Sequence, residues 1–284
     1  MSQVLFCQEK NSEFFGDTFY QKKQYDLAIL EYEKTKLLQA NESVRDNLNS
    51  KLALSKMRQS KFEDSLDYIL DSKTFTGTYL RIFASMKSEY DKIYTPDLLE
   101  VEKSNTFSEL QKDRTKLLAG TVLLENRKFK KAKEFYNQLS LKSKDEEIQN
   151  LSKDVAAYTE KYNQLSHKSP YLAGLFSAIL PGSGQIYARH DVDGILAFFF
   201  NTLFIGSSVY MYRLESKANE GHFVSGFMGF MGFTFYAANI FGAVSSANRY
   251  NLYQERQFYK KIRDKFFNID TMERYSEVKF NVRF

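Results

Sequence analysis

The sequence predicts an all-α protein in which a short solenoid of helical repeats precedes a small helical transmembrane domain and an amphipathic C-terminal helix. Three observations predict this fold class. The first half of the chain repeats small and aromatic residues at fixed spacing. Two later segments have the length of a membrane-spanning helix and almost no charge. The stretch after them is basic and carries apolar residues on one helical face.

The composition changes abruptly near Ser169, and this change divides the chain. We expect an N-terminal tail over residues 1–10, a repeat domain over 11–166, a membrane domain over 169–250, and a basic helix with a tail over 251–284. Within the membrane domain, a re-entrant or short helix is expected over 171–187, and transmembrane helices over 193–213 and 222–247.

Five residues near the start of the chain recur, as like residues with the same spacing, after residue 119. A weaker third copy begins at Ala53, and Lys56 breaks its second position. The two complete copies consist of Gly16, Phe19, Tyr25, Ala28 and Tyr32, and of Gly120, Leu123, Phe129, Ala132 and Tyr136. All of these positions are expected to lie in the packed interior between helices.

This spacing resembles the tetratricopeptide repeat. The resemblance implies pairs of helices in which a small residue on the first helix lets the second approach closely, with aromatic residues filling the space between. Stacked pairs form an extended groove that commonly holds a peptide or a partner helix. The alternative is that so short an array acts only as a spacer.

The membrane domain begins with a piece too short to cross a bilayer. Residues 171–180 supply about 15 Å of helix, half of the roughly 30 Å of hydrocarbon. Pro181, Gly182 and Gly184 then interrupt the helix. Freed backbone groups are tolerated at membrane depth only where protein or water satisfies them. We therefore expect either a re-entrant half-helix covered by the two long helices, or a kinked short span.

Residues 177–187 read Ser-x-x-Leu-Pro-Gly-x-Gly-Gln-x-Tyr. This motif resembles one in small bacterial membrane domains of unknown function, loosely similar to the two-transmembrane-segment domain family. Those domains recur behind signal peptides or tetratricopeptide repeats, which implies a bacterial envelope protein but no particular chemistry. The candidate membrane residues are Pro181, Gly182, Gly184, Gln185, Asn201, Asn239 and Gly242.

Two asparagines are the notable polar residues of the long apolar segments. If the two helices pack antiparallel, Asn201 and Asn239 fall on the same side of the midplane, and we expect them to approach each other or share a hydrogen-bond partner. The alternative is that each bonds to nearby backbone. Ala238, Gly242 and Ser246 have small-xxx-small spacing, which offers a face for a homo-oligomer.

The C-terminal region predicts a helix at an anionic lipid surface. Tyr259, Ile262 and Phe266 share one helical face, and the positive-inside rule places the basic side in the cytoplasm. Residues 277–284 alternate as a strand does, or fray. The interfacial basic residues are Arg249, Arg256, Lys260, Lys261, Arg263 and Lys265.

The side of the membrane on which the repeats lie depends on the number of crossings. Three crossings put the repeats in the periplasm, and two crossings with a re-entrant piece put them in the cytoplasm with the tail. Residues 4–7 match the end of a signal or lipoprotein signal, or a frayed turn. Because of this match, we expect the repeats to lie in the periplasm.

The residue content argues against several function classes. A single Cys7 excludes an intramolecular disulfide or a multi-cysteine metal site, and His167, His190 and His222 are scattered. The apolar runs carry no charged residue, which disfavours a pump. A net charge of +5 without a basic stripe gives no reason to expect nucleic acid. We find no nucleophile with its base, metal-ligand set or phosphate loop, so no enzyme, cofactor or metal is expected.

The sequence thus predicts an adaptor anchored in the inner membrane of a bacterium, whose repeats bind a protein partner during envelope protein assembly. The alternative is a small oligomeric channel or a lipid-handling protein. In that case the Pro-Gly-x-Gly-Gln break would line a cavity with Ser183 and Gln185.

Overall fold

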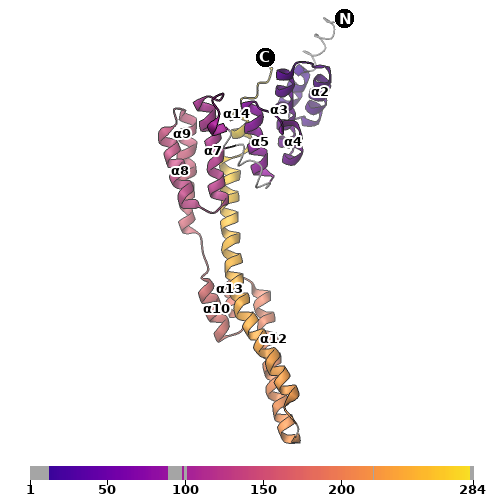
Figure 1. Cartoon of the computed structure of the whole chain (residues 1–284), viewed down its shortest axis with the longest axis vertical. Coiled ribbons are helices and arrows are strands. Elements are labelled where there is room, and N and C mark those ends of the chain that lie inside the picture. The colour runs from indigo at the N-terminus through magenta and orange to yellow at the C-terminus, as the bar shows by residue number, and fades with distance from the viewer. Residues whose placement is uncertain (1–12, 89–97, 99–100, 220, 282–284) are drawn as a thin grey trace. The chain divides into compact units, whose positions relative to one another are not determined.

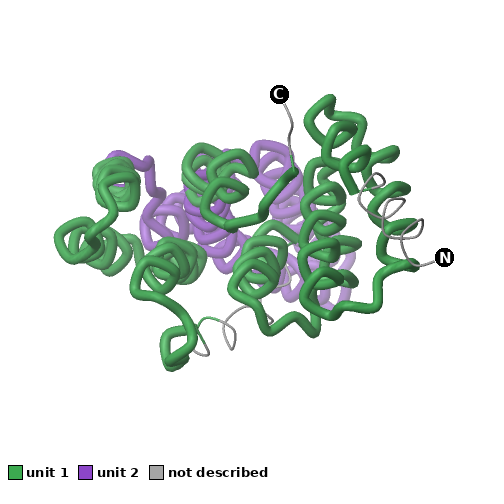
Figure 2. The backbone as a smooth tube through the Cα atoms, turned by 90° about the horizontal axis from the view of Figure 1, so that it is seen from above, with its two compact units in different colours: residues 1–160, 259–284 green, residues 161–258 purple. Residues whose placement is uncertain are grey.

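The computed structural model of the chain describes residues 13–88, 98, 101–219 and 221–281 (Figure 1). Every regular element in these ranges is a helix, which confirms the all-α class. The chain forms two compact units (Figure 2). Unit 1 consists of residues 1–160 and 259–284, and unit 2 of residues 161–258. The C-terminal segment thus belongs to the unit of the repeats, and is not the separate domain expected from residue 251.

The helices of unit 1 begin at side chains that the sequence makes recognisable. Ser108 forms a capping box with Gln111, and Asn41, Thr74 and Asp145 also accept hydrogen bonds from the first turn. The elements of unit 1 include α2 (Tyr25–Leu38), α3 (Glu42–Arg58), α4 (Phe62–Ile69), α5 (Phe75–Lys87), α7 (Glu109–Glu125), α8 (Phe129–Lys142), α9 (Glu146–Thr159) and α14 (Ile269–Tyr275). Residues 13–21 and 101–103 are also helical, and the end of α13 (Phe223–Phe266) belongs to this unit.

Three helix hairpins in unit 1 share the same turn. Lys23, Ser60 and Arg127 have φ angles of 58°, 62° and 59°, the left-handed conformation that ends many helices. The three sequence repeats begin at Gly16, Ala53 and Gly120. Each of the three left-handed residues lies the same number of residues after the first residue of its repeat. The weaker second copy therefore forms the same turn as the two complete copies.

Within each complete copy, the first of the five residues lies against the aromatic ring of the fifth. A Cβ atom added to Gly16 would lie 2.5 Å from the Tyr32 ring, and one added to Gly120 would lie 2.4 Å from the Tyr136 ring. Only a residue without a side chain lets the two helices approach so closely. Of the other repeat positions, Ala28, Phe129 and Ala132 are buried, while Phe19, Tyr25 and Leu123 are half-buried.

Unit 2 is built on a long helical hairpin. Its elements are α10 (Pro170–Ile179), α11 (Ser183–Tyr187), α12 (Asp191–Ala218) and most of α13 (Phe223–Phe266), and η1 (Glu160–Gln164) precedes them. The 28 residues of α12 extend over about 42 Å, and the 44 residues of α13 over about 66 Å. These two helices lie side by side in Figure 1. Phe204 stacks on Phe235 with ring centroids 4.8 Å apart, and Ser208 Oγ donates to the Ser225 carbonyl at 2.9 Å.

The predicted lipid-surface helix is wrong in two respects. It is the continuation of the second apolar helix, since α13 runs without a break from Phe223 to Phe266. Its apolar face is also covered by protein: Ile262 and Phe266 are buried in unit 1. An amphipathic pattern reports that one face needs an apolar partner, and it does not distinguish lipid from a helical repeat.

Some expectations fall on residues that the structure does not describe. The N-terminal tail over residues 1–10, its segment 4–7 and the chain end over 282–284 lie outside the described ranges. Residues 277–281 form no strand.

Candidate functional site: a membrane hairpin and a tail-binding repeat surface

The Pro-Gly break is a type II turn between α10 and α11. Ser183 N donates to the Leu180 carbonyl at 3.1 Å, and Gly182 has φ 88° and ψ −20°. Proline at the second position and glycine at the third are the residues that this turn requires. The turn therefore reverses the chain after half a membrane thickness of helix.

Glycines at the turn lie against backbone. A Cβ atom on Gly182 would lie 2.0 Å from the Gly194 carbonyl oxygen, and one on Gly184 would lie 1.9 Å from the Ala173 carbonyl oxygen. Neither carbonyl can move without shifting its helix. The sequence motif includes Gly182 and Gly184, whereas the close approach of Gly194 was not predicted.

We expect Gly184→Ala to destabilise unit 2 by about 2 kcal/mol or more, because the added methyl group meets backbone and cannot be accommodated by a rotamer change. Gly226→Ala is the matched control in the same unit, since a Cβ atom added there would meet no atom within 4 Å beyond its chain neighbours and its own helix backbone. Both can be measured by unfolding purified protein in mixed micelles with SDS. Equal stabilities would contradict the tight packing at the turn.

Three polar side chains join the turn to α13, and we name Ser177, Gln185 and Asn239 the turn network. Ser177 Oγ donates to Gln185 Oε1 at 2.8 Å and accepts from Gly184 N at 3.0 Å. Gln185 Nε2 donates to the Asn239 carbonyl at 3.0 Å and to Asn239 Oδ1 at 3.1 Å. Asn239 Oδ1 also accepts from Gly182 N at 3.0 Å, and Asn239 Nδ2 donates to the Ser177 carbonyl at 3.1 Å.

The turn network satisfies backbone groups that the break in the helix frees. Its three side chains are buried: their exposed fractions are at most 5%. Gln185 is therefore used to hold the turn against α13 and does not line an open cavity. Ser183 Oγ donates locally to the Leu180 carbonyl at 2.8 Å. The side chains that suggested a channel lining thus have internal partners.

The predicted pairing of the two asparagines is wrong. Asn201 Nδ2 donates to the Ala197 carbonyl of its own helix at 2.7 Å, and its Oδ1 is buried with no hydrogen-bond partner among the described residues. The side chain of Asn239 makes its hydrogen bonds within the turn network and to Gly182. The sequence held no signal that Asn239 would bond to Ser177, Gly182 and Gln185 instead.

Small residues on α13 serve packing inside unit 2. Gly242 lies against Gln185, where a Cβ atom would be 3.4 Å from Nε2. Ala243 and Ala247 form a buried cluster with Ala173 and Ala188. Of the three residues that suggested a homo-oligomer face, Gly242 thus lies against Gln185 and Ser246 is buried, whereas Ala238 is exposed.

The long hairpin exposes its apolar side chains. Both α12 and α13 are long and apolar enough to cross a membrane, and only 11% and 17% of their most apolar windows are buried. Phe198 is 47% exposed and Phe230 is 66% exposed. A core helix of a soluble protein would bury these side chains. Such a continuous apolar surface needs a non-aqueous partner.

The chain enters and leaves unit 2 at one end. Lys168 N donates to Asn251 Oδ1 at 2.7 Å, and Asn251 Nδ2 donates to the Lys168 carbonyl at 2.8 Å. Ser169 N donates to the Tyr187 hydroxyl at 3.1 Å, so the start of α10 meets the end of α11. Arg249 lies 3.8 Å from Asp193, which also lies 3.5 Å from His190. This end is polar and charged.

The opposite end of the hairpin is closed by Glu215, which the sequence reasoning missed. Its carboxylate accepts from Val224 N at 2.9 Å and from Ser225 N at 3.3 Å. These are orphan donors of the first turn of α13. His222 lies 3.7 Å from the same carboxylate and stacks on Tyr212. An acidic residue in the short segment between two apolar runs is the signal in the sequence that could have predicted this capping of α13.

A buried charge cluster in unit 1 was also missed. Lys51 Nζ, with a fully buried side chain, lies 2.8 Å from both Glu13 Oε1 and Asp17 Oδ1. The Tyr32 hydroxyl donates to Asp17 Oδ1 at 2.7 Å. Burial and the Asp17 carboxylate raise the pKa of Tyr32 far above its usual range, so the phenol stays protonated and donates. At the position equivalent to Asp17 the other complete copy has Thr121, and this difference was the available signal.

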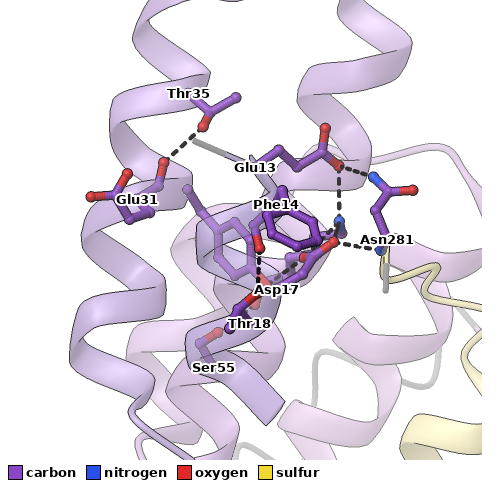
Figure 3. Close-up of polar contacts among 10 residues, drawn as sticks. Glu13, Phe14, Asp17, Thr18, Glu31, Thr35, Ser55 and Asn281 are labelled. Atoms are coloured by element: carbon purple, nitrogen blue, oxygen red, sulfur yellow. Dashed lines mark hydrogen bonds and ion pairs between the residues drawn. The ribbon is translucent and has the colours of Figure 1, made fainter. Parts of the chain in front are cut away.

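The C-terminal tail lies on this cluster. The ring of Phe280 stacks on Tyr20 with centroids 4.6 Å apart, and Asn281 N donates to Asp17 Oδ2. Figure 3 shows Glu13, Asp17 and Asn281 pointing toward one another. Upstream, Arg58 pairs with Asp270 and Glu273 of α14. The repeats therefore hold a segment of their own chain.

The predicted basic residues divide between the two units. Arg249 and Arg256 are exposed in unit 2. Lys260, Lys261 and Lys265 are exposed in unit 1, whereas Arg263 is only partly exposed and lies 3.4 Å from Asp264. Four of the six thus belong to the unit of the repeats. Among the described residues, no group of three or more His, Cys, Asp or Glu side chains is arranged to hold a metal ion.

Comparison with known proteins found no relative of this chain. No protein-family model, curated protein or solved structure matches the chain. The function is therefore inferred from the geometry of the two units.

Proposed function

We propose that this protein is a membrane-anchored adaptor: the hairpin of unit 2 crosses a bilayer, and the helical repeats of unit 1 bind a protein partner. The observation that carries the anchor is the exposed apolar surface of α12 and α13, together with charged residues at both ends of the hairpin. The observation that supports partner binding is the C-terminal tail held on the repeats. The resemblance of the repeats to tetratricopeptide repeats agrees with this role.

The geometry supports two crossings with a re-entrant piece. Residues 168 and 251 meet at one end of unit 2, and α10 and α11 leave that end and return to it. The ten residues of α10 reach about 15 Å, or half the hydrocarbon thickness. Both chain segments that flank unit 2 then lie on one side, in agreement with their membership in one compact unit.

The distribution of basic residues supports cytoplasmic repeats. Lys168, Arg189 and Arg249 lie at the end where the chain enters and leaves, joined by Arg256 beyond it, while Arg213 and Lys217 lie at the hairpin end. The positive-inside rule assigns the more basic end to the cytoplasm. Our proposal thus replaces the expectation of periplasmic repeats. The inner membrane of a bacterium is part of the proposal through the resemblance of residues 177–187.

Crosslinked pull-down tests the adaptor. The full chain should recover a protein partner from a detergent extract of its native membranes, and a chain of residues 161–258, which lacks the repeats, should not. Recovery of the same proteins with both chains, or of none with the full chain, would contradict partner binding by unit 1.

A further inference from the structure

The final described residues contact the repeats through three features. Glu277 accepts from Arg114 at 2.7 Å and from Gln111 Nε2 at 2.9 Å. Three positions later, the Phe280 ring stacks on Tyr20. The next residue, Asn281, donates from its backbone to Asp17 and from its side chain to Glu13 at 3.2 Å. A carboxylate, an aromatic ring and an amide thus each find a dedicated partner.

The receiving surface is electrostatically matched to these groups. Glu13, Asp17 and Lys51 hold two negative charges against one positive, so the cluster favours N–H donors such as those of Asn281. The Lys51 ammonium also lies 5.5 Å from the centroid of the Phe280 ring, within cation–π range. Arg114 supplies the positive charge for a carboxylate.

The tail lies on the surface, unlike the segment before it. Phe267, Met272 and Tyr275 are buried and belong to the core of unit 1. In contrast, Glu277 and Asn281 are exposed, and Phe280 is half-buried. Residues 277–281 make specific contacts without filling the core, which is the property of a segment that can leave and be replaced.

We infer that residues 277–281 are a tethered ligand, and that the partner's docking segment has the same chemistry: a carboxylate three positions before an aromatic residue that is followed by asparagine. This inference rests on the proposed function and specifies the partner. The partner segment competes with the tail, whose tether gives it a high effective concentration. Weakening the tail therefore opens the site.

The test uses the full chain in detergent micelles and a fluorescent peptide with the sequence of residues 276–284. A chain carrying Glu277→Ala and Phe280→Ala together should bind the peptide at least tenfold more tightly than the wild-type chain. A peptide with the Phe280→Ala change should bind the opened chain at least tenfold more weakly. Lys279→Ala is the matched control, because Lys279 lies in the tail with an exposed side chain. This chain should bind as weakly as the wild type.

Four outcomes would overturn the inference. Equal peptide affinity for opened and wild-type chains would show that the tail blocks no site. Undiminished binding of the peptide with the Phe280→Ala change would show that the site does not recognise the aromatic ring. If the opened chain and a milder Asn281→Ala chain both lose helical structure that added peptide does not restore, the tail is a structural strut. A partner captured equally by opened and wild-type chains would remove the inference and leave the adaptor intact, whereas peptide binding without any captured partner would remove the adaptor.

Discussion

Lys51→Met will lower the free energy of unfolding of unit 1 by about 3–5 kcal/mol, because removal of one partner leaves a buried charge uncompensated. Asp17 is 1% exposed and faces the Lys51 ammonium directly. Without this ammonium, its remaining bonds to Tyr32 and Asn281 cannot neutralise the carboxylate. Urea unfolding followed by far-ultraviolet circular dichroism measures the loss.

Two further variants identify the cause of that loss. Lys34→Met removes a lysine of the same unit whose side chain is 63% exposed, and its effect should stay within about 1 kcal/mol. The double change Lys51→Met with Asp17→Asn should be more stable than Lys51→Met alone, because the orphaned charge is gone. A double variant that loses the sum of the two single effects would contradict an electrostatic cause.

Asn239→Leu will destabilise unit 2 by about 2–4 kcal/mol, because it leaves several buried polar groups without partners at once. The side chain accepts from Gly182 N and Gln185 Nε2 and donates to the Ser177 carbonyl. Leucine has a similar size but can replace none of these bonds. Unfolding in SDS-containing mixed micelles, with helix content as readout, measures the loss.

Asn201→Leu is the matched control for this change. Asn201 lies on the neighbouring apolar helix, and among the residues described its side chain bonds only to the Ala197 carbonyl of its own helix. We expect an effect within about 1 kcal/mol, and additivity when both asparagines are changed, because they share no partner. A double variant that is clearly more stable than the sum predicts would indicate the direct pairing that the structure does not contain.

Local patterns predicted much of the fold. The spacing from Gly16 to Tyr32 recurs from Gly120 to Tyr136, and in both copies the glycine lies against the tyrosine ring. Proline at 181 and glycine at 182 are the residues that the type II turn uses. The lengths of the two apolar runs located the hairpin. In each case the physical requirement is met by residues close in sequence, or by a period that a single chain displays.

The remaining features depend on contacts that sequence spacing does not encode. The apolar face at Ile262 and Phe266 fits lipid or protein equally well, and only the fold shows that unit 1 covers it. Gln185 reaches Asn239 across 54 residues, and Asn281 reaches Asp17 across 264. Such partners meet only when the whole chain folds. A polar residue in an apolar run therefore predicts that a hydrogen bond exists, but its position does not identify the partner residue.

Thiol labelling from one side of a sealed membrane tests most directly that α12 and α13 cross lipid. In chains carrying Cys7→Ser, a cysteine is placed either at Gly221, which is exposed with open space around its Cβ position between α12 and α13, or at Ser166, just before α10. In intact spheroplasts, a membrane-impermeant maleimide should label Gly221→Cys at once and Ser166→Cys only after lysis. Equal labelling of both positions before lysis would contradict a hairpin that spans the bilayer.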